Sequence, residues 1–144
     1  MKRFFSEIQR KRAFKSQLNL LKQDLKDCLL LLKNGRYRSA YIFLFDSLER
    51  VFDLFFITKG EKPSKRIERE ELIFKHFSPE IYRKFRSFYY ERRGGMYEDF
   101  VLINRRDLKQ LFIFFKKTFL EIRRRIKKIN GEIEKLMREI EKLT

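Results

Sequence analysis

The stretch RYRSAYIFLFDSLERVFDLFFIT, residues 36–58, has the pattern of an amphipathic helix. Its apolar side chains recur at helical steps and form one stripe along a helix, made of Tyr37, Ala40, Tyr41, Leu44, Leu48, Val51, Phe52 and Phe55. A second face of the same helix carries charge, at Asp46, Glu49, Arg50 and Asp53. Taken alone, its three carboxylates are interpreted as solvated charges paired with Arg50. The spacing predicts a helix with one buried side, and Gly60 follows its last turn as a stop.

A long helix is predicted over residues 6–33, upstream of this stretch. Its apolar residues recur at alternating steps of four and three, at Phe14, Leu18, Leu21, Leu25, Cys28 and Leu32. Asn34-Gly35 ends the helix, since glycine suits a left-handed cap. Cys28 is the only cysteine, so an internal disulfide is excluded, and we interpret it as a small core residue.

Two shorter helices are predicted downstream of Gly60. The third helix begins with Ser64 as its N-cap and ends near His76. The fourth begins at Ser78-Pro79, because serine caps a helix and proline is tolerated in the first turn. The paired glycines Gly94-Gly95 are predicted to break this fourth helix.

The fifth helix is predicted to begin with a capping box at Asn104 and Asp107. From Phe115 onward its apolar residues keep heptad steps through Asn130-Gly131, which favours one long helix bent at that glycine. The alternative is a turn followed by a short separate tail. The apolar residues of this heptad seam that follow residue 128 have few evident packing partners within the chain. The sequence therefore predicts that they pack against a second copy, in a homodimer.

These segments predict an all-α fold, an antiparallel helical bundle of four to five helices with a long C-terminal helix. We expect a single domain over residues 1–144, with a core over about 14–128 and a helical C-terminal extension over 129–144. Short connections between successive helices favour antiparallel neighbours.

The formal net charge of +16 is concentrated at the two ends of the chain. Charge of that sign attracts nucleic acid, an anionic membrane or an acidic protein. Basic side chains along the last helix are interpreted either as a solvated face or as a phosphate-binding surface. The candidate nucleic-acid-binding residues are Arg93, Arg105, Arg106, Lys109, Lys116, Lys117, Arg123, Arg124, Arg125, Lys127 and Lys128.

The sequence lacks the motifs of several classes of site. There is no Cys/His cluster of metal-binding spacing and no glycine-rich phosphate loop, so neither a metal nor a cofactor is expected. The amino-terminal residues lack the apolar segment of a secretion signal, and no segment is apolar enough to span a bilayer. A cytoplasmic location without membrane association is therefore the expectation.

The segment FYYERRGGMYED, residues 88–99, combines two arginines, two glycines and a tyrosine. One interpretation is structural, since cations suit the end of a helix and glycines stop it. The other is that the break presents the guanidinium of Arg92 and the phenol of Tyr97 near one another, in a form that recognises phosphate.

The order of the helices, the Lys-Pro-Ser loop at residues 62–64 and the 88–99 segment resemble a HEPN domain over about residues 14–128. HEPN domains are helical domains often found beside minimal nucleotidyltransferases in archaea and bacteria. The catalytic members are metal-independent ribonucleases that use an arginine and, four to six residues later, a histidine, brought together across a homodimer. A polar residue on the second helix often supports that site.

The resemblance implies that Arg92 is the motif arginine, with Asp46 or Glu49 supporting it from the second helix. Tyr97 stands where the motif has histidine. A tyrosine, with an ordinary pKa near 10, is poorly suited to move a proton at neutral pH, so enzymatic activity is left open. The only histidine, His76, lies about sixteen residues upstream of Arg92.

Three functions follow from these observations. The first is a HEPN-like partner of a minimal nucleotidyltransferase, in a toxin–antitoxin-like or nucleotide-binding module. The second is a metal-independent HEPN ribonuclease acting as a homodimer. The third is a non-enzymatic basic bundle that binds nucleic acid by charge alone. RNA and nucleotides are the candidate ligands, and the sequence does not decide between them.

Overall fold

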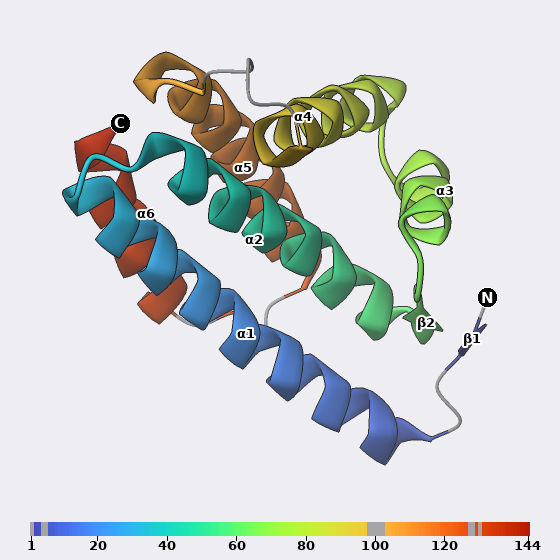
Figure 1. Cartoon of the computed structure of the whole chain (residues 1–144). Helices are drawn as coiled ribbons and strands as arrows, with labels where there is room; N and C mark the ends of the chain where they lie inside the picture. The colour runs from blue at the N-terminus through green and yellow to red at the C-terminus, as the bar shows by residue number, and fades with distance from the viewer. Residues whose placement is uncertain (1, 4–5, 98–102, 127–128, 130) are drawn as a thin grey trace.

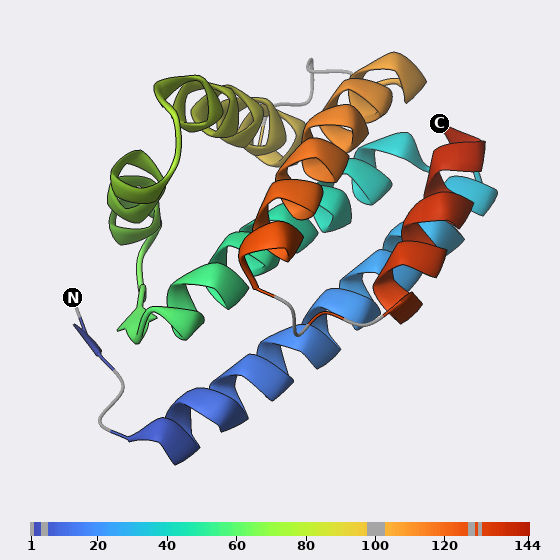
Figure 2. The same ribbon diagram turned by 180° about the vertical axis from the view of Figure 1, so that it is seen from behind.

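Helix α2, Tyr37–Thr58, is the helix around which most of the others pack. Its neighbours are α1 (Glu7–Lys33), α3 (Arg66–His76), α4 (Pro79–Tyr97) and α5 (Arg105–Arg125). Figure 1 and Figure 2 show α1 on one flank of α2, with α3 and α4 on the other. The predicted all-α helical bundle is confirmed.

The computed structural model describes the backbone of residues 2–3, 6–97, 103–126, 129 and 131–144, and the side chains of these apart from 2–3 and 94–97. Two short strands that the sequence did not predict lie within it. Strand β1, Lys2–Arg3, pairs antiparallel with β2, Glu61–Lys62, in the connection between α2 and α3. This pairing brings the first residues of the chain against the α2–α3 connection.

The core around α2 is wider than the predicted stripe. Because helices pack on more than one side of α2, the additional residues Phe45, Leu54 and Phe56 are also buried. Phe52 lies at the centre of the aromatic part, with its ring centroid 5.2 Å from that of Phe77 and 5.5 Å from that of Phe85, both edge to face. Each such buried ring contributes roughly 1.5–3 kcal/mol relative to an exposed one.

Several helix ends lie where the sequence predicted them. Gly35 follows α1 with a positive φ of 68°, the conformation for which glycine is favoured. Asn104 and Asp107 form the predicted capping box at the start of α5. Ser64 is not the N-cap of α3, however. The helix begins two residues later, and Ser64 instead donates a backbone hydrogen bond of 2.8 Å to Glu68.

The predicted break at Gly94-Gly95 is wrong, because α4 continues through both glycines to Tyr97. A glycine inside a helix costs roughly 1 kcal/mol relative to alanine. That penalty is small beside a continuous ladder of backbone hydrogen bonds, so composition alone does not end the helix.

The single long C-terminal helix is also wrong, and the alternative of a separate tail is what the structure shows, because α5 ends at Arg125 and another helix begins at Gly131. The chain leaves helical geometry at Ile126, earlier than the predicted bend, and α6, Gly131–Leu143, packs back along α1 (Figure 2). Ile133, Met137 and Ile140 are buried there. The seam that predicted a homodimer is thus covered within the chain, and the segment after residue 128 is part of the core.

Candidate functional site

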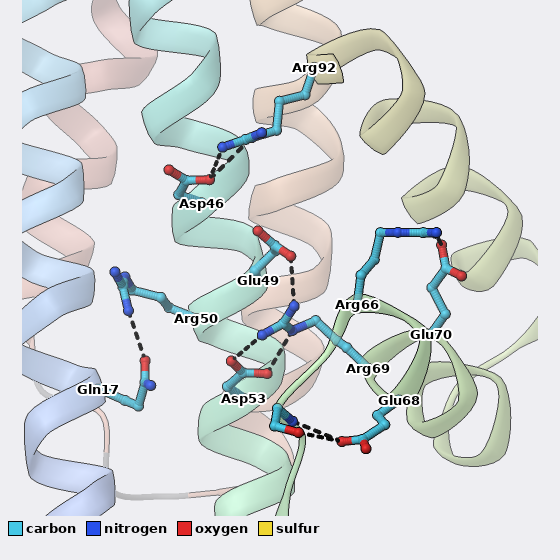
Figure 3. A network of polar contacts seen from close by, with 11 residues as sticks. Gln17, Asp46, Glu49, Arg50, Asp53, Arg66, Glu68, Arg69, Glu70 and Arg92 are labelled. Atoms are coloured by element: carbon cyan, nitrogen blue, oxygen red, sulfur yellow. Dashed lines mark hydrogen bonds and ion pairs between the residues drawn. The ribbon is translucent and has the colours of Figure 1, made fainter. Parts of the chain in front are cut away.

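The acidic face of α2 is the centre of a polar network between helices (Figure 3). Asp46, Glu49 and Asp53 lie on this face at steps of three and four residues, so they share one side of the helix. The interpretation of these residues as solvated charges paired with Arg50 is wrong. Asp53 is buried, and the three carboxylates are bound by arginines from α3 and α4.

Arg92 of α4 binds Asp46 of α2. Its Nε and Nη2 atoms lie 3.2 and 3.0 Å from the same oxygen, Oδ1. The guanidinium also lies 5.9 Å from the ring centroid of Phe45, and only 19% of the Arg92 side chain is exposed. The contact that the resemblance implied between an acid of the second helix and Arg92 is therefore present.

Arg69 of α3 makes the strongest set of bonds to this face. Its Nε and Nη2 bind the two oxygens of Asp53 at 2.8 Å each, and its Nη1 binds Glu49 at 2.8 Å. Glu49, one of the two predicted supports of Arg92, is thus hydrogen-bonded to Arg69. The sequence did not identify Arg69, because the rotation of α3 that directs it toward α2 depends on tertiary packing.

Arg50 projects toward the opposite flank of α2. It binds Asp24 of α1 at 2.5 Å and Gln17 at 3.1 Å. Ionic contacts thus join α2 to α1, α3 and α4.

Burial alters the acidity of the site carboxylates. It raises the pKa of Glu49 above the usual range, against the lowering effect of Arg69. Burial likewise raises the pKa of Asp46, and Arg92 opposes the change. For Arg69, desolvation is outweighed by its bonds to Asp53 and Glu49, which raise its pKa and keep it charged. The arrangement is a set of fixed guanidinium groups held by one buried carboxylate, Asp53, and two partly buried ones, Asp46 and Glu49.

His76 lies away from Arg92. Its Nε2 is 2.9 Å from Oε1 of Glu61, and its ring packs on Phe55. Phe55 is nine residues from Asp46 along α2, which corresponds to about 14 Å of helix. Arg125 donates a hydrogen bond of 3.0 Å to the His76 carbonyl. The histidine is therefore part of a packed contact at the far end of α2.

The Tyr97 side chain lies outside the described part of the structure, as do Lys127 and Lys128. The predicted approach of Tyr97 to Arg92 thus stays a prediction. Among the described side chains, no three of His, Cys, Asp or Glu are grouped so as to hold a metal ion.

The predicted basic residues are exposed but differ in their surroundings. Those on the surface of α4 and α5 are Arg93, Arg105, Arg106, Lys109, Lys116, Lys117, Arg123, Arg124 and Arg125. Lys116 is paired with Glu141 at 3.0 Å, Arg123 with Glu134, and Lys117 more loosely with Glu80 at 3.8 Å. Arg125 instead lies 4.7 Å from the ring centroid of Phe77 and 3.0 Å from Glu121, so it has a packing role.

No family model, curated protein or solved structure matches this chain. None of the helices within the described ranges combines the length and apolarity needed to cross a bilayer. A function for this chain is therefore inferred from the site itself.

A second polar cluster, which the sequence did not identify, includes Glu91, the residue before Arg92 in the sequence. Tyr41 of α2 is fully buried, and burial together with the nearby Glu91 raises its pKa. Burial, and then Asp107 at the start of α5, raises the pKa of Glu91. Tyr41 was predicted only as a core residue, since its place in the apolar stripe gives no sign of an acidic neighbour. Cys28 is buried as predicted, and burial raises the pKa of its thiol to about 12.

Proposed function

We propose that this chain is a HEPN-like helical protein that binds the phosphate groups of a nucleotide or RNA at Arg92. In this proposal it is the partner of a minimal nucleotidyltransferase, in a toxin–antitoxin-like or nucleotide-binding module. The observation that carries the proposal is the pairing of Arg92 on α4 with Asp46 on α2. This is the pair of helices that the resemblance links at the functional arginine.

The geometry suits binding. Two nitrogens of Arg92 are held on one oxygen of Asp46, so the guanidinium has a fixed place and orientation. A guanidinium recognises phosphate through several N–H donors in one plane, and fixing it in advance reduces the entropy lost on binding. Arg93, the next residue, is exposed and adds a second positive charge at the same end of α4.

The position of His76 favours binding over histidine-dependent cleavage. The ribonuclease alternative needs a proton carrier beside Arg92. His76 is the only histidine in the chain, and Glu61 and Phe55 hold it about 14 Å along α2 from Asp46. A homodimer also belongs to this proposal, but since α6 covers its own apolar seam, the dimer is supported by the resemblance alone.

Replacing Arg92 with alanine is expected to weaken ATP binding about 10- to 100-fold, because hydrogen bonds to a charged group contribute about 1.5–3 kcal/mol. Equilibrium dialysis with labelled ATP measures this. Arg12→Ala on α1 removes an equal charge elsewhere and should leave the affinity within about twofold. Asp46→Asn keeps the Arg92 guanidinium but weakens the hydrogen bonds that hold it, so an intermediate loss of ATP affinity is expected.

Equal affinities for Arg92→Ala and the unmodified protein would contradict the phosphate-binding role. The partner role is tested separately, by co-expressing the tagged chain with a minimal nucleotidyltransferase encoded beside it and purifying by the tag. A stoichiometric complex supports the proposal, and a chain that purifies alone argues against it. Cleavage of RNA in the presence of EDTA, lost in Arg92→Ala, would replace the binding proposal with the ribonuclease.

The exposed cations of α5 favour the basic nucleic-acid-binding bundle as a second candidate. For a single strand, the slope of log affinity against log salt falls by about 0.7 for each phosphate contact removed. The variant Arg105→Gln, Lys109→Gln, Arg124→Gln should therefore reduce that slope by about 2, measured by anisotropy of a labelled RNA 12-mer. The matched triple Arg12→Gln, Lys15→Gln, Lys33→Gln on α1 should leave it unchanged, and equal slopes for both sets would contradict a binding face on α5.

A further inference from the structure

A row of aromatic and basic side chains runs along the outer surface of α3 and α4. Tyr82, Arg86, Tyr90 and Arg93 follow one another on α4 at steps of four, four and three residues, so they share one face of the helix. Phe74 of α3 lies against its first member. We call these five residues the α4 ladder.

From Phe74 to Tyr90, each member of the α4 ladder contacts the next. The ring centroids of Phe74 and Tyr82 are 5.2 Å apart, with the rings at 73° to each other. The Arg86 guanidinium lies 5.7 Å from the Tyr82 ring centroid and 5.8 Å from that of Tyr90. Its Nη2 also donates to the Tyr90 hydroxyl at 3.3 Å. The result is a continuous surface of rings separated by a cation.

Two of the three rings of the α4 ladder are open to solvent, and the third, that of Tyr82, is partly buried. Phe74 is 63% exposed and Tyr90 is 50% exposed. Seven other aromatic side chains of this protein, Tyr41, Phe45, Phe52, Phe56, Phe85, Phe115 and Phe119, are fully buried, so the fold has a core that does not need these two. A single exposed apolar side chain is ordinary, but a connected row of them marks an interaction surface.

We propose that the α4 ladder binds single-stranded RNA, with bases stacked on Phe74, Tyr82 and Tyr90 and phosphates on Arg86 and Arg93. The proposal names the ligand class of the proposed function and rests on it for the choice of RNA. Aromatic side chains interleaved with cations are how proteins hold single strands without reading sequence, because every base has a face that stacks.

The dimensions suit a single strand. Tyr82 and Tyr90 are eight residues apart, which places their Cα atoms about 12 Å apart along α4. In a duplex the bases are stacked inside and present only their edges, so these rings have nothing to stack on. The ladder ends at Arg93, beside the anchored Arg92, so a strand lying on it leads its phosphates toward the Arg92 site.

Anisotropy measurements with two labelled probes test this inference, namely a 12-residue oligoadenylate and an abasic sugar–phosphate 12-mer of equal charge. The variant Phe74→Ala, Tyr90→Ala should bind oligoadenylate at least about 30-fold more weakly, since two stacking rings are lost, and the abasic 12-mer within about twofold. Tyr90→Phe keeps the ring and should stay within about threefold of the unmodified protein on both probes. Circular dichroism verifies that each variant is folded.

Three results would overturn the inference: equal losses on both probes, no loss on oligoadenylate, or no binding of oligoadenylate by the unmodified protein. A change in sedimentation of the double variant without a change in RNA affinity would overturn it too, and would assign the surface to a second copy of the chain. Arg92→Ala, by contrast, should weaken both probes. Failure of the Arg92 site is therefore distinguishable from failure of the ladder.

Discussion

Replacing Arg69 with alanine is expected to lower the free energy of unfolding by about 3–5 kcal/mol, because it leaves buried carboxylates without a counter-charge. The side chains of Arg69 and Asp53 are 16% and 11% exposed, and Glu49 is 21% exposed. Urea denaturation at pH 7 measures the change. Lys84→Ala, which breaks an exposed pair with Glu80, should leave the midpoint unchanged.

The effect of Arg69→Ala should shrink as the pH falls. Burial raises the pKa of Glu49 in the folded protein, and Arg69 opposes that rise. Without Arg69 the folded-state pKa of Glu49 is higher still, and folding then favours the protonated carboxyl. Stability linked to a raised pKa is present below the unfolded value and is lost as the pH rises through the folded value. Arg69→Ala should therefore lose the most unfolding free energy above that folded-state pKa. A loss of equal size at pH 4 and pH 7 would contradict the role of Glu49.

Phe52→Ala is expected to cost about 3–5 kcal/mol of unfolding free energy, the usual range for removing a fully buried ring. Phe52 packs against Phe56, Phe77 and Phe85, so its loss leaves a cavity where α2 meets α4. Thermal and urea denaturation both measure the change.

Phe74→Ala is the matched control for Phe52→Ala, because it removes the same atoms from a side chain that is 63% exposed. Its effect on stability should be small, which also makes it usable in the RNA-binding experiment. If the two variants lost similar stability, the aromatic core would not be centred on Phe52.

Much of the fold follows from local patterns that act within a few residues. Asn104 and Asp107 satisfy each other's backbone donors, and Gly35 takes the left-handed conformation after α1. Such features depend on neighbours in sequence, so the sequence predicts them. The all-α bundle was predictable for the same reason.

The errors lie where tertiary contacts decide. An unbroken heptad pattern is compatible with one helix or two, and the burial of Ile133 and Ile140 against α1 favours two. Gly94-Gly95 has a weak local preference that the rest of α4 overrides. In both cases a small local conformational preference is outweighed by tertiary contacts, which the sequence alone does not reveal.

The candidate site was predicted in part. The contact between Arg92 and Asp46 was expected from the resemblance, whereas Arg69, which makes more hydrogen bonds to the same face, was not. Nothing in the spacing of α3 marks Arg69, since its role arises from how α3 is turned toward α2.

Ten phenylalanines are buried among the described residues, so much of the core is built from side chains of one shape. Apolar contact alone then discriminates weakly between one rotation of a helix and the next, because a core that keeps its volume and pattern loses uniqueness of packing before it loses stability. By contrast, the bidentate hydrogen bonds from Arg69 to Asp53 are directional and fix the relative orientation of the two side chains. Directional polar bonds of this kind favour one packing arrangement of the helices, while burial of the aromatic rings supplies most of the stabilisation.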